Sequence, residues 1–295
     1  MDARNGMVVM GVLNVTPDSF SDGGLYGEGE AGVESAVGAG VAMAEAGAGV
    51  IDVGGESTRP GAGRVGVEEQ VRRVVPVVAG LRERLDGVGL GGVLISVDTT
   101  RWAVAEAALG AGAGMVNDVS AGEDDGAMLA GVARAGVGLA LMHKKGEPAT
   151  MQDRPRYRDV VEEVRGYLGE RVGAAVEAGV QRGLVWVDPG IGFGKTLEHN
   201  LALLGALEGL VEWAAGEGLA GVLVGASRKR MIGELNPRGG QRPGDRLGGT
   251  VAITALSAWA GVGMVRVHDV AENVQAVRMV EAVKAVKAAQ EERGR

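Results

Sequence analysis

The stretch at residues 51–61, Ile-Asp-Val-Gly-Gly-Glu-Ser-Thr-Arg-Pro-Gly, joins an apolar run to residues that could bind a ligand. Its two glycines allow positive φ and a close approach of the backbone to a ligand. Thr58 and Arg59 add a hydroxyl and a guanidinium, which suit an anionic or carbonyl-bearing partner. The pattern predicts a strand that delivers a ligand-binding loop. The alternative is a tight turn in which Asp52 and Arg59 only pair with their neighbours.

Acids and one carboxamide follow other apolar runs, at Asp52, Asp98, Asn117 and Asp188. If these positions converge, they form a floor that suits a fused amino-pyrimidinone edge, because such an edge carries several hydrogen-bond donors and acceptors in one plane. The alternative is that Asp98 and Asp188 cap the helices that follow them. Since three acids and an Asn share this placement, we expect a site.

Cations gather after the last two apolar runs, where a (β/α)₈ barrel commonly binds phosphate. Arg228 and Lys229 follow Gly-Ala-Ser, and Arg266 and His268 follow the final run. This placement favours a phosphorylated substrate. His268 alone would be read as a hydrogen-bonded structural residue, but beside Arg266 we interpret it as part of the site.

The chain has three histidines, at 143, 199 and 268, and no cysteine. So few histidines argue against a multi-histidine metal site, and the lack of cysteine excludes thiolate ligands, cysteine nucleophiles and disulfides. A hard ion such as Mg²⁺, carried in by phosphates and held by one protein oxygen, fits the composition.

Residues 188–195, Asp-Pro-Gly-Ile-Gly-Phe-Gly-Lys, resemble a phosphate-binding glycine loop only superficially. They lack the four-residue gap and the Lys-Ser/Thr ending of a Walker motif, so nucleotide binding gains little support. Phe193 stands among glycines, where an aromatic ring is suited to cover a flat ligand. The alternative is that the ring covers the packing of the fold itself.

Eight short apolar runs could position these residues, at 7–13, 50–53, 93–97, 115–116, 137–142, 184–187, 221–224 and 263–267. Most are continuous, as expected for strands of a parallel sheet buried on both faces. Segments with helical spacing lie between them, for example at Leu197, Leu201, Leu204 and Leu207. Eight alternations in 295 residues predict an α/β fold, a TIM (β/α)₈ barrel, with a doubly wound sheet as the alternative.

Polar residues follow nearly every run, which favours the barrel, because an open sheet binds ligands mainly at its switch point. No linker or shift in composition divides the chain, so we expect one domain over residues 1–295. Long loops are expected at 15–30, 54–66, 143–156 and 233–248. Loops of this length in a compact barrel commonly cover the substrate.

The net charge of −8 is spread without a basic block, so nucleic acid is not an expected partner. The N-terminus shows no signal-peptide pattern, and no apolar run approaches the ~20 residues of a membrane span. We therefore expect a cytoplasmic protein that does not enter a membrane.

The motifs together resemble those of the dihydropteroate synthases, the folate-pathway transferases that sulfonamides inhibit. The resemblance covers residues 8–280 and rests on five segments in the family's order, at residues 11–24, 52–61, 188–195, 227–229 and 266–269. It implies a condensation in which para-aminobenzoate displaces diphosphate from a hydroxymethyl-dihydropterin diphosphate, with Mg²⁺ as the cofactor. It also implies a homodimer through helices far from the barrel mouth. Residues 252–260, with Trp259, are a candidate face, although core packing would explain Trp259 equally well.

By residue match, the resemblance assigns each substrate a set of residues. The pterin would be bound by Asp98, Asn117, Asp188 and Lys229, with Val119 and Met142 as apolar walls. The diphosphate would be bound by Asn14, Arg266 and His268, and Asn14 would also meet the metal. The aminobenzoate would be bound by Thr58, Arg59, Pro60, Phe193 and Ser227. The catalytic set implied is Asp98, Lys229, Arg59 and Asp188.

The sequence departs from the family pattern at two places, which involve three residues. Lys144 and Lys145 follow His143, where relatives usually carry Met and then Gln or Arg, and Arg230 follows Lys229, where some relatives carry Ser. A cation at Arg230 could replace the hydroxyl contact or simply be solvated.

Two other functions stay open. A methyltetrahydrofolate-binding barrel of a corrinoid methyltransferase would use a similar acid-and-Asn floor, but it would not need the segments at 57–60 and 227–229. A silent paralogue would bind a pterin without making product.

Overall fold

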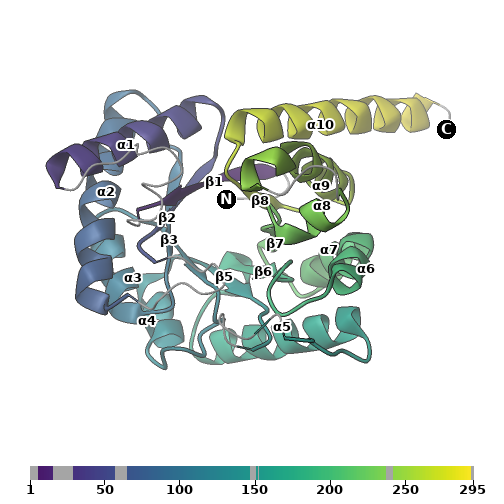
Figure 1. The fold of residues 1–295 in the computed structure, drawn as a ribbon, viewed down its shortest axis with the longest axis horizontal. Helices are drawn as coiled ribbons and strands as arrows, with labels where there is room; N and C mark the ends of the chain where they lie inside the picture. The colour runs from purple at the N-terminus through teal and green to yellow at the C-terminus, as the bar shows by residue number, and fades with distance from the viewer. Residues whose placement is uncertain are drawn as a thin grey trace.

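The computed structural model describes residues 6–15, 29–56, 65–146, 151, 153–236 and 242–293. Within them, eight parallel strands close into a barrel in chain order, and helices surround it (Figure 1). The strands are β1 (Val8–Asn14), β2 (Val50–Gly54), β3 (Leu94–Asp98), β4 (Met115–Asp118), β5 (Gly138–Met142), β6 (Val185–Asp188), β7 (Gly221–Val224) and β8 (Met264–Val267). The predicted (β/α)₈ barrel is confirmed, and the doubly wound sheet is excluded.

The helices of the described residues follow the strands around the outside of the barrel. They are α1 (Glu30–Glu45), α2 (Val67–Gly87), α3 (Trp102–Gly110), α4 (Met128–Ala135), α5 (Val160–Glu177), α6 (Leu197–Gly205), α7 (Leu207–Gly216), α8 (Arg230–Glu234), α9 (Leu247–Trp259) and α10 (Val270–Arg293), with short 3₁₀ turns η3 (Arg182–Leu184) and η4 (Pro243–Arg246). The leucine spacing that predicted one helix after β6 is divided between α6 and α7, which meet at Ala206.

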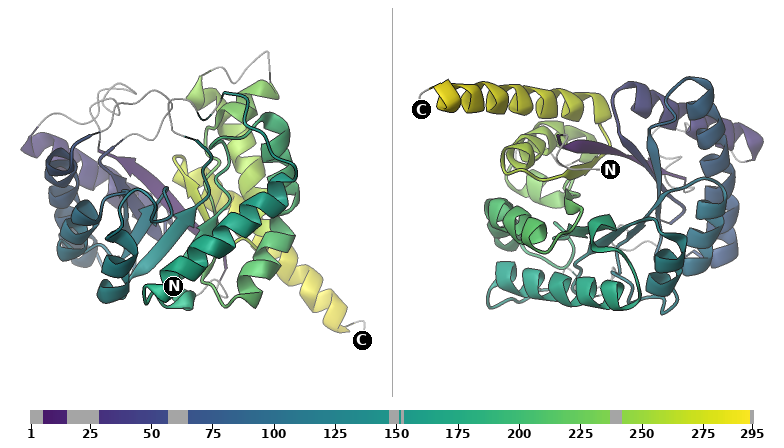
Figure 2. Two further views of the ribbon diagram at one scale, coloured as in Figure 1. Left: turned by 90° about the horizontal axis from the view of Figure 1, so that it is seen from below. Right: turned by 180° about the vertical axis from the view of Figure 1, so that it is seen from behind.

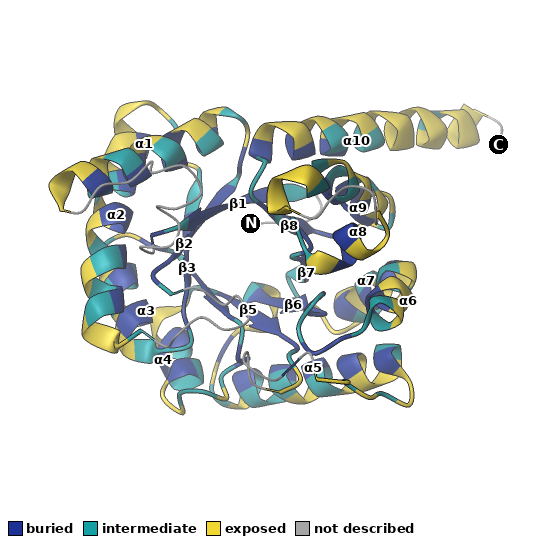
Figure 3. Cartoon of the chain, viewed as in Figure 1, coloured by how far each residue is buried: buried dark blue, intermediate teal, exposed yellow. Residues whose placement is uncertain are grey.

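The strands are apolar on both faces because each face meets a different part of the core. Outward residues such as Val9, Ile51 and Val97 pack against the helices in one large cluster. The alternate residues fill the barrel interior as a second cluster, made of Met10, Val50, Met115, Ala140, Trp186, Leu223 and Met264. Figure 3 shows the strands and the inner sides of the helices buried. Burial on both faces explains why the runs were continuous rather than alternating.

The interior cluster sets the position of the next layer of side chains. Side chains along a strand point alternately to its two faces, so the residue two places after an interior residue also points inward. This rule takes Val50 to Asp52 and Met264 to Arg266. It also takes Met115 to Asn117 and Trp186 to Asp188. The parallel register then pairs Asp98 with Asn117 and Met142 with Asp188 on neighbouring strands. The candidate polar residues therefore share the carboxyl end of the barrel interior.

The C-terminal helix α10 packs against the barrel over only its first part. Val270, Val274 and Val277 are buried there. The rest of the helix projects beyond the barrel and is largely exposed (Figures 1–3). Among the described helices, none is both long and apolar enough to cross a membrane.

Candidate active site

An ion-pair network closes the floor of the barrel mouth. Arg266 on β8 donates from Nε to Asp52 Oδ2 at 2.6 Å and from Nη2 to Asp98 Oδ2 at 2.7 Å. Asn117 on β4 donates from Nδ2 to the same Asp52 oxygen at 2.9 Å. Asp52 is fully buried. It therefore anchors Arg266 and Asn117 from below, while Asp98 completes the ion pair from β3. The cap alternative for Asp98 is not realised, since Asp125 accepts the hydrogen bond from the first backbone N–H of α3.

Asp98 titrates near neutral pH. Burial raises the pKa of its carboxyl to about 7, with Arg266 opposing the shift and the negative charge of Asp52 adding to it. A carboxylate with a strongly perturbed pKa in a barrel mouth is a functional candidate. Its charged form can stabilise a cation or accept a hydrogen bond from a ligand.

Asp188 and Lys229 form the second charged group of the mouth. Asp188 Oδ1 accepts a hydrogen bond from Gly190 N at 2.7 Å, so this acid also shapes the turn after β6. Burial raises the pKa of Asp188 to about 6, although that hydrogen bond and Lys229 oppose the shift. Burial lowers the pKa of Lys229 to about 8, and Asp188 opposes that shift. Lys229 Nζ also lies 3.9 Å from the centroid of the Phe193 ring.

The apolar residues assigned to the pterin lie beside this group. Met142, at the end of β5, is buried and pairs in register with Asp188. Val119 directly follows β4 and is partly buried. Both stand at strand ends that open into the same mouth, as the sequence predicted.

Asn14 is the last residue of β1 and pairs in register with Gly54, the last residue of β2. A Cβ added to Gly54 would lie 3.4 Å from Asn14 Oδ1 and 3.5 Å from Asp98 Cβ. A side chain at Gly54 would therefore crowd both the Asn14 carboxamide and Asp98, and the glycine leaves room for the two.

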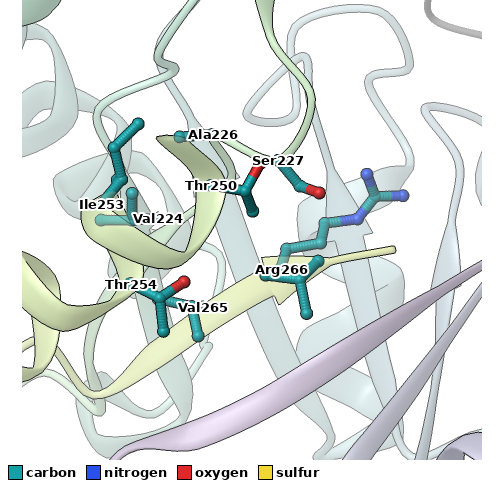
Figure 4. A pocket seen from close by; sticks show the side chains of 9 residues that line it. Val224, Ala226, Ser227, Thr250, Ile253, Thr254, Val265 and Arg266 are labelled. Atoms are coloured by element: carbon teal, nitrogen blue, oxygen red, sulfur yellow. The ribbon is translucent and has the colours of Figure 1, made fainter. Parts of the chain in front are cut away.

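The loops after β7 and β8 are joined through Ser227. Its Oγ accepts a hydrogen bond from His268 N at 3.2 Å and lies 3.0 Å from His268 Nδ1. Figure 4 shows the Arg266 side chain extending from β8 past Ser227, with its guanidinium pointing away from Thr254. Ser227, His268 and Arg266 are thus gathered at one edge of the mouth, as expected for the anion-binding end.

A small cavity lies behind these loops, between β7, β8 and α9 (Figure 4). It is lined by Val224, Ala226, Ser227, Thr250, Ile253, Thr254, Val265, Arg266 and Val267, and it measures about 10 Å³. That volume is at the lower limit for a single water molecule. It is a packing gap rather than a substrate site.

Arg228, which the sequence placed among the candidate phosphate-binding cations, pairs with Asp269 instead. Its Nε and Nη2 donate to the two carboxylate oxygens of Asp269 at 3.0 and 2.6 Å, and its own carbonyl accepts from Arg246 Nη1 at 2.9 Å. The sequence could not separate Arg228 from Lys229, because both follow the same strand. The bidentate pair indicates a structural clamp between the β7 and β8 loops.

We expect Arg228→Met to lower the free energy of unfolding by about 1.5–3 kcal/mol, since it removes charge-assisted hydrogen bonds to Asp269. Thermal or urea unfolding measures this change. Arg230→Met is the matched control, because Arg230 is highly exposed and its ion pair among the described residues is with Glu234, one helical turn away; its cost should stay below about 0.5 kcal/mol. Equal stability of the two variants would contradict the clamp.

Of the departures from the family pattern, Lys145 and Arg230 are exposed, while Lys144 is partly buried in an ion pair. Lys144 pairs with Asp124 at 3.0 Å, and Lys145 donates to the Arg156 carbonyl at 2.7 Å. Arg230 is solvated, which was one of the two readings of its sequence position.

Thr58, Arg59 and Pro60 lie outside the described residues. The segment's two flanks are joined through Glu56, which accepts hydrogen bonds from Val65 N and from Gln70 Nε2, each at 3.0 Å. Glu56 thus links the described residues on either side of this segment, beside the end of β2.

Comparison with known proteins matches residues 10–268 to the family of pterin binding enzymes. The dihydropteroate synthase of Mycobacterium leprae is 49% identical over 276 residues, which cover 92% of each chain. The solved Xanthomonas albilineans dihydropteroate synthase with 4-aminobenzoic acid is 45% identical, with a TM-score of 0.83 over 95% of this chain and 94% of that one. The same enzyme solved in complex with 7,8-dihydropteroate is 42% identical, with a TM-score of 0.80 over 95% of each chain.

The fold, the floor of acids and Asn117, and these matches over nearly the whole length agree with one another. The chain belongs to the dihydropteroate synthase family of pterin-binding enzymes.

Proposed function

We infer that this chain condenses (7,8-dihydropterin-6-yl)methyl diphosphate with para-aminobenzoate to give 7,8-dihydropteroate and diphosphate, a step of folate biosynthesis. The observation that carries this conclusion is the convergence of Asp98, Asn117, Asp188 and Lys229 in one barrel mouth. The solved relatives with 4-aminobenzoic acid and with 7,8-dihydropteroate support the two substrate classes.

The pterin is assigned to the floor of the mouth. Asp98 and Asp188 offer acceptors for ring N–H and amino groups, and Lys229 offers a donor for ring nitrogen or carbonyl oxygen. Asn117 is held by Asp52, which fixes the direction of its carboxamide. Met142 and Val119 supply apolar contact for the flat faces of the ring.

The diphosphate is assigned to Asn14, Arg266 and His268, and Asn14 also to Mg²⁺. Among the described residues, no group of three or more acids and histidines could hold a metal by itself. A single amide oxygen at Asn14, beside the carboxylate of Asp98, fits a Mg²⁺ ion whose other ligands are phosphate oxygens and water. When bound, the ion would neutralise charge on the leaving diphosphate.

The mechanism requires charge stabilisation rather than a protein nucleophile. If the carbon–oxygen bond of the pterin diphosphate breaks first, positive charge develops on the pterin and negative charge on the diphosphate. The Asp98 carboxylate faces the first, while Arg266 and His268 face the second. The aminobenzoate nitrogen, held within reach of the pterin methylene carbon, then forms the new bond and loses a proton.

The aminobenzoate is assigned to the edge of the mouth that carries Phe193 and Ser227, together with Thr58, Arg59 and Pro60. Phe193 is half-buried against Lys229, so its exposed face is open to a second aromatic ring. Of this set, Arg59 and its two neighbours lie outside the described residues, and their role stays a prediction.

Diphosphate release in the presence of pterin diphosphate, para-aminobenzoate and Mg²⁺ tests the proposal. Omitting para-aminobenzoate should abolish sustained release. A chain that binds the pterin but releases nothing would be a silent paralogue. A chain that instead transfers a methyl group from methyltetrahydrofolate would belong with the corrinoid methyltransferases.

We further propose that two copies associate through α9 and the exposed part of α10. Leu256 and Trp259 on α9 and Met279, Val283 and Val286 on α10 are between 43% and 67% exposed. Lys284 Nζ donates to the carbonyls of Ala258 and Trp259 at 3.1 and 3.2 Å, which ties the two helices together. Exposed apolar side chains gathered on two adjacent helices are typical of an interface between subunits.

Light scattering coupled to size exclusion is expected to give twice the 30.0 kDa of one chain. Replacing Met279 and Val283 together with Glu should yield the monomer mass, because two carboxylates would be buried in the interface. Leu201→Glu on α6 is the matched control, since Leu201 is similarly exposed, at 42%, on another face. A monomeric wild-type chain would contradict the proposal.

A further inference from the structure

The loop after β6 folds around the ammonium group of its own last residue. Lys195 Nζ donates to the carbonyls of Gly190 and Phe193 at 2.9 and 3.0 Å, and it lies 2.9 Å from His143 Nδ1. Lys195 is only 3% exposed. An ammonium has three N–H donors, so these three contacts use all of them. The residue that made residues 188–195 look like a phosphate loop therefore points inward, away from any phosphate.

One acid and two other lysines act electrostatically on the Lys195 ammonium. Burial lowers the pKa of Lys195 to about 7; Asp188 opposes this shift, whereas Lys229 and Lys145 add to it. Burial and the Lys195 charge lower the pKa of His143 to about 3, so its ring is neutral and its Nδ1 lone pair can accept a hydrogen bond from Lys195. Carbonyl and imidazole acceptors, rather than a carboxylate partner, hold the ammonium in place.

The same loop rests directly on the backbone that follows β5. Gly190 and Gly194 have φ of 65° and 63°. A Cβ at Gly190 would lie 1.8 Å from the His143 carbonyl oxygen, and a Cβ at Gly194 would lie 2.1 Å from the Lys145 carbonyl oxygen. Lys195 bridges the two segments, since its ammonium contacts His143 after β5 and the Gly190 and Phe193 carbonyls of the loop. It links the end of β5 to the loop that carries Phe193.

Phe193 is the side chain that this loop presents to the mouth. Its carbonyl is held by Lys195, and its ring lies against Lys229 Nζ at 3.9 Å. Among the described contacts of the loop, two others stand on either side of Phe193. Gly192 N donates to Asn200 Oδ1 at 2.7 Å, and Tyr157 donates to the Gly194 carbonyl at 2.8 Å. Two charged groups of the described residues contact Phe193 itself, Lys229 at the ring and Lys195 at the backbone carbonyl. Lys195 is therefore the charged group that holds the Phe193 backbone.

We propose that Lys195 is a positioning residue, which sets the place of Phe193 and thereby the affinity for the aromatic amine without touching either substrate. The inference rests on the proposed function, in which Phe193 covers para-aminobenzoate. The Lys195 ammonium binds loop carbonyls and His143 rather than the side chains assigned to the pterin, so its loss should raise KM for the second substrate far more than KM for the pterin.

The test is steady-state kinetics of Lys195→Met with each substrate varied in turn. We expect KM for para-aminobenzoate to rise about tenfold, the factor that one lost charge-assisted hydrogen bond carries. KM for the pterin diphosphate should stay within about twofold. Lys145→Met is the matched control, because its ammonium is exposed and contacts Arg156 and Glu163 outside the mouth. Both of its KM values should match those of the wild type.

A double-mutant cycle with Phe193→Ala separates positioning from general loosening. If Lys195 acts through Phe193, the double variant should be no worse for para-aminobenzoate than Phe193→Ala alone. Additive effects, a parallel rise of both KM values, or an unchanged KM for para-aminobenzoate would each overturn the inference. If Lys195→Met does not fold, Lys195→Gln keeps two N–H donors and is judged by the same criteria. A wild-type chain without activity would instead refute the proposed function.

Discussion

Asp98→Asn should lower turnover by about 10²–10³-fold while changing pterin affinity only a few-fold. The substitution keeps the shape of the side chain and one acceptor oxygen, but it removes the charge that stabilises a cationic pterin, and preorganised charges of this kind carry factors of this size. Steady-state kcat and calorimetric binding of the pterin diphosphate measure the two quantities separately.

The pH dependence gives the same residue a second signature. Because burial raises the pKa of Asp98 to about 7, its carboxylate is charged above that pH and is lost as the pH falls through it. The wild-type kcat/KM should therefore decline on the acid side of about pH 7, since this parameter reports groups of the free enzyme. Asp98→Asn should lose the decline near pH 7 and keep only the one that Asp188 contributes near pH 6.

Asp118→Asn is the control for this prediction. Asp118 is also fully buried at a strand end, but its carboxylate accepts hydrogen bonds from Ser120 and Gly122 within its own turn. The change should cost about 1–3 kcal/mol of stability through mismatched donors and leave turnover within a few-fold. Unchanged turnover in Asp98→Asn, or equal loss in both variants, would remove Asp98 from the proposed electrostatic role.

Gly190→Ala is expected to lower the free energy of unfolding by about 2–5 kcal/mol. A side chain at this left-handed position costs about 1–2 kcal/mol, and forcing atoms into a packed contact costs about 1–3 kcal/mol more. Both penalties apply, because φ is 65° and the new Cβ would lie 1.8 Å from the His143 carbonyl oxygen. Chemical denaturation measures the loss.

Gly166→Ala provides the comparison. Gly166 lies within α5, has no atom within 4 Å of the added Cβ, and does not have positive φ. Alanine there should stabilise the protein by about 0.4–1 kcal/mol, because glycine is a poor helix former. If Gly190→Ala were as stable as the wild type, the glycine loop could not be packed on the β5 end as described.

The strands and the identity of most site residues could be predicted from the sequence because both depend on local patterns. Continuous apolar runs mark strands buried on both faces, and a polar residue directly after such a run lies at the mouth of a parallel barrel. Asp98, Asn117 and Asp188 were found in this way.

Side-chain pairs between distant strands could not be predicted, because they depend on strand register and on how the sheet closes into a barrel. Arg266 meets Asp52 and Asp98 because β8 closes onto β1 and all three side chains point into the carboxyl end of the barrel. The two-residue step from Val50 to Asp52 and from Met264 to Arg266 was a usable signal once the barrel was assumed.

Side-chain direction in the loops was also beyond the sequence. Lys195 ends a glycine-rich segment and so resembled a phosphate ligand, yet its ammonium is enclosed by carbonyls. Arg228 was grouped with Lys229 by proximity, but its left-handed backbone, with φ of 57°, turns it to Asp269 instead.

The most direct test of the function is a single reaction in which both products are quantified. The purified chain is mixed with the pterin diphosphate, para-aminobenzoate and Mg²⁺, and dihydropteroate and diphosphate are measured by chromatography over time. We expect equal molar amounts of dihydropteroate and diphosphate from the wild-type chain, with formation of both reduced about 10²–10³-fold in Asp98→Asn. A chain that binds the pterin diphosphate but forms no dihydropteroate would contradict it.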